Sequence, residues 1–193
     1  MILHVRQKVL RNEQPAMNKS KVPAKVVEEL NRQLNQELGA AHSYRALSYW
    51  CEEQNLKGFA RYFGKQVEEE HAHAGKIASH LIDRNLLPET GAIAAPKISF
   101  KSLLEVALHA QAMEQANTQG INSVYEAALA AKDFPAQVLM HFFISEQVEE
   151  ENWCAEMVER VQRASCAGSL SDLDRHIERY LAESLFSDDG KTE

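Results

Sequence analysis

Five prolines divide this 193-residue chain, and their spacing limits the possible fold more than any other feature. They stand at positions 15, 23, 88, 96 and 135, which leaves proline-free runs at 24–87, 97–134 and 136–193. Proline interrupts a helix because it lacks the amide hydrogen and clashes with the preceding turn. Runs of this length with apolar residues at helical spacing predict a few long helices.

The apolar spacing predicts four long helices and one short one. The first spans about 23–53 with Pro23 in its first turn, and the second follows the turn signal at 54–58 and ends near 84. The third runs from about Ser99, an N-cap candidate, to 131, and the fourth from Pro135 to 163. A short fifth helix is expected near 171–184, beyond Gly168. The predicted core positions of the second and fourth helices include Phe59, Tyr62, Phe63, Val67, Ala74, Ile77, Leu81, Ile82, Val138, Leu139, Phe142, Phe143, Val148, Trp153, Met157 and Val161.

The linker at 85–98 decides how these helices are connected. Its residues could span about 46 Å when extended, whereas the second helix should be about 42 Å long. The linker can therefore cross the full length of the bundle. We predict an all-α four-helix bundle with one long crossover and a short fifth C-terminal helix. The expected organisation is a polar N-terminal extension (1–22), the bundle (23–165), and the fifth helix with a polar tail (166–193).

Composition narrows the class of partner. The chain has 28 acidic and 21 basic side chains and a formal charge of −7, which argues against nucleic acid or an anionic membrane and favours cations. Its 3 cysteines form no C-x-x-C motif, and no apolar stretch approaches the length of a membrane helix. We therefore expect a cytoplasmic protein.

All four long helices carry polar groups on the face that should be buried. Burying several carboxylates together costs several kcal/mol per ion, and a divalent cation removes that penalty. Carboxylates with an imidazole suit iron or manganese. The residues are Glu37 on the first helix, Glu70 and His73 on the second, Glu114 on the third, and Gln147 and Glu150 on the fourth.

The motifs that carry these residues resemble those of the bacterial non-haem ferritins, over about residues 22–165. They are LNQELGAAHSYRALSYW, QVEEEHAHAGK, MEQ and FISEQVEEE. Other diiron bundles have a second Glu-x-x-His on the fourth helix, where this chain has Gln147-x-x-Glu150. That departure is the pattern of the non-haem ferritins.

The resemblance implies a diiron centre and an adjoining third iron site. Glu37, Glu70 and His73 would hold the first iron, and Glu70, Glu114 and Glu150 the second, with Gln147 nearby. Glu69, Glu146 and Glu149 would build the third site, and Tyr44 would stand beside the diiron centre. For these last four residues, a solvated helix face and a core tyrosine are the alternatives.

The function that the resemblance implies is iron storage with ferroxidase activity. Iron would be cofactor and substrate, O2 would oxidise Fe(II) to Fe(III), and ferric mineral would collect in a hollow homo-oligomeric shell of 24 subunits, without haem. The fifth helix would build the fourfold contacts of that shell.

Other functions remain open at this stage. A bacterioferritin would have a haem-binding methionine where this chain has His71, and a rubrerythrin-like peroxidase would need the second Glu-x-x-His. His71 and His109 are either additional ligands or surface or interface histidines. A helical interaction protein with a lost metal site is the alternative outside the enzymes.

Overall fold

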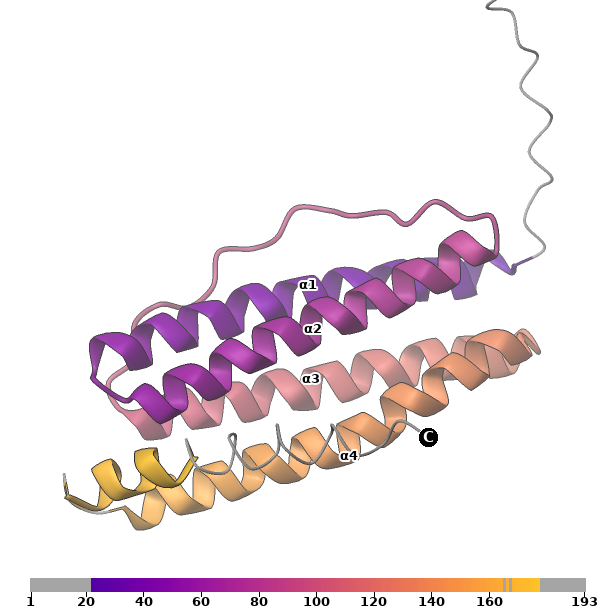
Figure 1. The fold of residues 1–193 in the computed structure, drawn as a ribbon. Coiled ribbons are helices and arrows are strands. Elements are labelled where there is room, and N and C mark those ends of the chain that lie inside the picture. Colours follow the sequence, from indigo (N-terminus) through magenta and orange to yellow (C-terminus); the bar gives the residue numbers. More distant parts are fainter. Residues whose placement is uncertain (1–21, 165, 167, 178–193) are drawn as a thin grey trace, which may run out of the picture.

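Four long helices form one bundle in the computed structural model, which describes residues 22–164, 166 and 168–177 (Figure 1). The helices are α1 (Ala24–Glu53), α2 (Lys57–Asp83), α3 (Leu103–Ala130) and α4 (Phe134–Arg163). Residues 168–177 form a further helical segment, and this described part of the chain contains no strand. The predicted all-α bundle is confirmed. The extension at 1–21 lies outside the described residues.

Three helix ends are closed by the same backbone motif. Asn55, Asn85 and Lys132 follow α1, α2 and α3 with φ values of 58°, 60° and 55°. In each case the next amide bonds back five residues, as from Leu56 N to Cys51 O at 2.9 Å. This is the Schellman arrangement, which satisfies carbonyls that a helix end leaves unpaired. The turns after α1 and α3 are therefore short, and α1–α2 and α3–α4 are antiparallel pairs.

The segment between α2 and α3 runs along the outside of α1 and α2 to the opposite end of the bundle (Figure 1). Two asparagines of α1 hold it. Asn31 Oδ1 accepts from Glu89 N at 2.9 Å, and Asn35 bonds Glu89 O and Gly91 N at 2.7 and 2.6 Å. The predicted crossover is confirmed, and it makes α2 and α3 run in the same direction.

The N-terminus of α3 corrects one prediction. The helix begins at Leu103 and its N-cap is Ser102, whose hydroxyl accepts from Glu105 N at 3.2 Å. Ser99 lies in the preceding loop. Ser102 has the advantage that Glu105 follows three residues later and bonds the backbone N–H of Lys101 at 2.8 Å. Sequence position alone did not separate the two serines.

The helical segment 168–177 packs against the start of α2. The carboxylate of Asp174 is buried and accepts from Phe59 N at 3.0 Å, so it satisfies a free amide in the first turn of α2. A Cβ on Gly58 would lie 2.0 Å from Asp174 O, so only glycine permits this approach. The segment starts at 168, earlier than the predicted 171, and the hydroxyl of Ser169 in its first turn accepts from Cys166 N at 3.1 Å and donates to Cys166 O at 2.8 Å. Residues 178–184 of the predicted helix lie outside the described part.

The core consists of two apolar clusters separated along the bundle. One contains Tyr44, Phe59 and Phe63, and the other contains Leu30, Ile77 and Met140. Three predicted core positions are wrong, since Ile82, Val138 and Val148 are 59%, 68% and 69% exposed. In the described residues no helix is long and apolar enough to cross a membrane.

Candidate metal centre

A layer of buried polar side chains separates the two apolar clusters, and all four helices contribute to it. Glu37, Glu70 and Glu114 are 0%, 3% and 1% exposed, a degree of burial that is rare for carboxylates. The other members are less charged or less buried. They are Gln33, His73, Asn117 and Gln147, which are buried, and Glu150, which is partly exposed.

Three of these side chains could share one cation. Glu37, Glu70 and His73 each offer a ligand atom, and these atoms lie within 4.8 Å of one another. Glu70 Oε2 and His73 Nδ1 are buried without a hydrogen-bond partner and stand 3.6 Å apart. Buried polar atoms are almost always satisfied. Two orphaned ligand atoms beside a second carboxylate, that of Glu37, therefore fit a metal ion.

The protonation of these carboxyls points the same way. Burial raises the pKa of Glu37 to about 9 and that of Glu70 to about 8. Burial, with the charges of Glu114 and Glu69, raises the pKa of Glu150 to about 7. Glu37 and Glu70 thus retain a proton at neutral pH, and Glu150 is about half protonated, unless positive charge compensates them. A divalent cation would displace these protons.

Glu114 is held by two neighbours. Tyr44 donates its hydroxyl to Glu114 Oε1, and Gln147 Nε2 donates to Glu114 Oε2 at 3.2 Å. Gln147 Nε2 also bonds Thr118 Oγ1 at 3.1 Å. The Gln147 amide therefore faces the Glu114 carboxylate as a donor, an orientation in which it fixes a ligand. Burial and the Glu114 charge raise the pKa of Tyr44 well above its usual value, so Tyr44 stays protonated.

The residues suggested for a third iron site are less tightly gathered. Glu69 lies close enough to Glu150 to raise its pKa, and it is also paired with Lys65 at 3.3 Å. Glu146 is partly exposed and Glu149 is exposed. None of the three belongs to the cluster of Glu37, Glu70 and His73, which is the sole such grouping in the part of the chain that is described.

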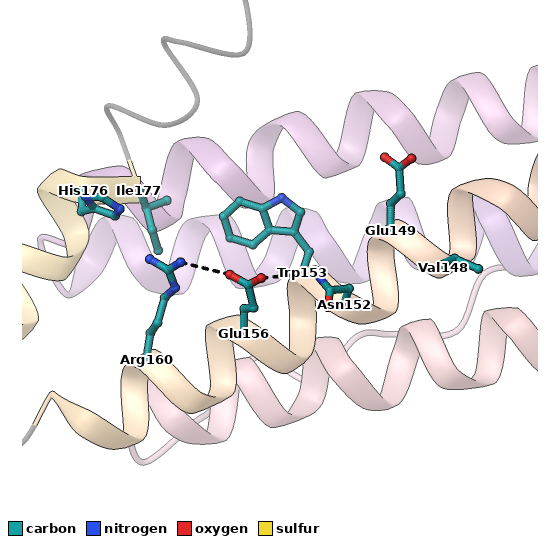
Figure 2. Close-up of a pocket in the computed structure, with 8 residues that line it drawn as sticks. All are labelled: Val148, Glu149, Asn152, Trp153, Glu156, Arg160, His176 and Ile177. Carbon is teal, nitrogen blue, oxygen red and sulfur yellow. Dashed lines mark hydrogen bonds and ion pairs between the residues drawn. The ribbon is translucent and has the colours of Figure 1, made fainter.

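Glu149 lines a surface cavity of about 440 Å³ between α4 and the segment 168–177. Figure 2 shows Glu149, Trp153 and Arg160 on α4 and His176 on the segment 168–177, and Arg160 is paired with Glu156 at 3.0 Å. Trp153 packs on Tyr62 at 5.1 Å between ring centroids. The cavity therefore lies beside the apolar cluster that contains Tyr44, Phe59 and Phe63.

The two additional histidines lie outside the cluster. His71 is exposed on α2, two residues before His73 but on a different face. His109 packs against Phe100 of the crossover at 5.5 Å between ring centroids, and burial lowers its pKa. Both arrangements fit the surface or packing alternative.

Two residues that hold Glu37 were absent from the predicted site. Gln33 lies one turn before Glu37 on α1, and Asn117 lies three residues after Glu114 on α3. Their amides donate to the two oxygens of Glu37 at 2.8 and 3.0 Å. The sequence could have indicated both residues, since each is a polar residue one turn from a candidate ligand on the same face of its helix.

Similarity to known proteins agrees with this geometry. The ferritin-like domain profile of the ferritin family matches residues 27–164. The bacterial non-heme ferritin of Staphylococcus aureus (strain USA300) is 38% identical over 127 residues, which cover 66% of this chain and 76% of that protein. The protein of the same name from Staphylococcus haemolyticus is also 38% identical over 127 residues.

Solved structures give the same result. An open pore ferritin from the hyperthermophilic archaeon Archaeoglobus fulgidus has a TM-score of 0.79 and 29% identity, covering 81% of this chain and 98% of that one. A closed form of that ferritin, engineered by site-directed mutagenesis, is 30% identical with a TM-score of 0.79. With its crossover bundle and its layer of buried carboxylates, the chain belongs to the ferritin family.

Proposed function

We propose that this protein is a non-haem iron storage protein with ferroxidase activity. It oxidises Fe(II) with dioxygen inside each subunit. The Fe(III) is retained as mineral in a shell built from copies of the protein, and the resemblance implies that this shell has 24 subunits. The observation that carries the proposal is the pair of orphaned ligand atoms, Glu70 Oε2 and His73 Nδ1, in a buried layer of carboxylates. The similarity to proteins named bacterial non-heme ferritin supports it.

The donor set suits oxidation better than reversible electron transfer. Hard carboxylate oxygens favour the ferric over the ferrous state, because they stabilise the higher charge. Two Fe(II) ions would be accommodated, one by Glu37, Glu70 and His73, the other by Glu70, Glu114 and Glu150. Each would give one electron to dioxygen, so that two electrons, with two protons from water, would reduce it to hydrogen peroxide. Glu70 has an oxygen free of hydrogen bonds and is therefore the residue best able to serve both ions.

Residues around the site would support the reaction in different ways. Tyr44 and Gln147 hold the Glu114 carboxylate by hydrogen bonds. Glu69, Glu146 and Glu149, on the more exposed side, would form the third iron position. Haem has no part in the proposed chemistry.

The test follows ferric absorbance after Fe(II) is added in air to the apo-protein, together with the native mass. We expect a large assembly that oxidises Fe(II) faster than buffer. Glu37→Ala and His73→Ala should each slow the rapid phase about 10-fold or more, since each removes a ligand. Their matched controls are Glu53→Ala and His71→Ala, which remove exposed side chains of the same helices.

Two results would contradict the proposal. One is a monomer or dimer that oxidises Fe(II) no faster than buffer. The other is a haem absorbance in the isolated protein, which would favour the bacterioferritin alternative.

A further inference from the structure

The carboxylate of Glu37 is held by a closed ring of three side chains, which we call the Glu37 clamp: Gln33, Asn117 and Glu37. Gln33 Nε2 donates to Glu37 Oε1 at 2.8 Å and to Asn117 Oδ1 at 2.6 Å. Asn117 Nδ2 donates to Glu37 Oε2 at 3.0 Å. Gln33 and Glu37 are 0% exposed and Asn117 is 2% exposed. Each bond is therefore shielded from water.

The ring has one possible orientation once Glu37 is ionised, as it must be to bind a cation. A carboxylate only accepts hydrogen bonds, so both amide nitrogens then face Glu37. The oxygen of Asn117 then accepts the second hydrogen of Gln33, which fixes the amide of Gln33 as well. Because each Glu37 oxygen accepts one hydrogen bond, each keeps a lone pair for a metal ion. The amides are neutral, so they orient the carboxylate without adding a charge that would repel a cation.

The backbone of α3 is shaped to accept Gln33. A Cβ on Gly120, three residues after Asn117, would lie 2.2 Å from Gln33 Oε1. The clamp belongs to a seam between α1 and α3, in which Gln36 Nε2 bonds Ala116 O at 2.7 Å and Arg32 Nη2 bonds Gly120 O at 2.9 Å. The hydrogen bonds of this seam fix the distance between α1 and α3. At that distance the amides of Gln33 and Asn117 reach the carboxylate of Glu37 and orient it.

The neighbouring ligands are held differently. Glu70 Oε2 and His73 Nδ1 have no hydrogen-bond partner, although both are buried. Glu37 is thus fixed at both oxygens, whereas Glu70 is free at one. We propose that Gln33 and Asn117 are positioning residues that preorganise Glu37 as a fixed ligand for a cation held by Glu37, Glu70 and His73. This inference rests on the proposed function, since it deepens the same site.

The test measures equilibrium binding of Co(II), a divalent ion that needs no oxidation step, by titration and by its visible ligand-field spectrum. Gln33→Met and Asn117→Leu remove the amides at similar volume. We expect each to weaken binding of the first Co(II) by about 10- to 100-fold, the range for residues that orient a ligand, and to change the ligand-field spectrum. The control is Gln36→Met, which removes the hydrogen bonds of Gln36 to Ala116 O and to Arg32 in the same seam but none to Glu37.

The outcomes distinguish the clamp from a general effect on helix packing. Weaker binding and an altered spectrum in both clamp variants, with Gln36→Met like the parent protein, support the clamp. Equal losses in all three variants would assign the effect to helix packing and overturn it. Tight binding with an unchanged spectrum in the clamp variants would overturn it and leave the proposed function standing. A parent protein that binds no Co(II) would overturn both. Melting temperature and native mass, measured on every variant, identify any that does not fold, and Gln33→Asn then replaces Gln33→Met.

Discussion

At the scale of the residue, the carboxyls of the buried layer set how stability depends on pH. In the unfolded chain Glu70 and its neighbours lose their protons near the ordinary value of 4.5, whereas the folded apo-protein keeps them to about 9 for Glu37, 8 for Glu70 and 7 for Glu150. The folded state therefore binds more protons than the unfolded chain between these values. It follows that the free energy of unfolding falls as pH rises through this window.

Glu70→Gln should reduce this loss, because it replaces a buried ionisable group by a neutral one of the same shape. We expect the apo-variant at pH 8 to be more stable than the parent by about 1–4 kcal/mol. At pH 5, where Glu70 of the folded parent is protonated and the pH is only just above the ordinary value of 4.5, the difference should fall to about 1 kcal/mol or less. Thermal and denaturant unfolding in the presence of a chelator, from pH 5 to 9, measures the effect. Glu68→Gln, an exposed change on the same helix, is the control, and a parallel pH profile for Glu70→Gln would contradict the prediction.

At the scale of the element, long-range contacts decide positions that helical periodicity leaves open. The spacing of apolar residues predicted the four helices, and the four-residue periodicity identified Glu37 and Glu114 as inward. The same periodicity wrongly predicted that Val138 and Val148 of α4 are buried, since they are 68% and 69% exposed. A single helix shows which residues share a face. It does not show how wide a part of that face its neighbours cover, and α4 packs mainly against α3.

Gly58→Ala tests the docking of the segment 168–177. The added Cβ would lie 2.0 Å from Asp174 O, a backbone atom that cannot turn aside. We expect a loss of about 1–3 kcal/mol in the free energy of unfolding, the usual cost of overpacking. Gly39→Ala and Gly75→Ala are matched controls, since a Cβ at either meets nothing within 4 Å. Those changes should be neutral or stabilising by up to about 1 kcal/mol. An equal effect of all three changes in denaturant unfolding would refute the docking.

At the scale of the whole molecule, apolar surface remains uncovered in the single subunit. Leu129, Phe134 and Val138 flank the turn between α3 and α4 and are 56%, 67% and 68% exposed. Exposed apolar side chains gathered in one place are typical of protein contacts. In the proposed shell, this end of the bundle would be covered by neighbouring subunits.

Phe134→Asp should therefore impair assembly while the subunit still folds. A charge in a buried contact is costly, whereas the same charge on an exposed position of the free subunit is not. We expect native mass spectrometry to show smaller species and circular dichroism to show unchanged helix content. The control is Gln119→Asp, an exposed polar position of α3. A full-size assembly for Phe134→Asp would place the subunit contacts elsewhere.

The sequence by itself determined the helices and the inward polar residues, because both depend on spacing within one helix. It did not determine the Glu37 clamp. Gln33 and Asn117 lie 84 positions apart, and their hydrogen bond exists because α1 and α3 pack at one particular register. The same is true of Asp174 and Phe59, 115 positions apart. Local periodicity places a side chain on a face, but a hydrogen bond between helices requires positions accurate to tenths of an ångström, and only the packed bundle sets those.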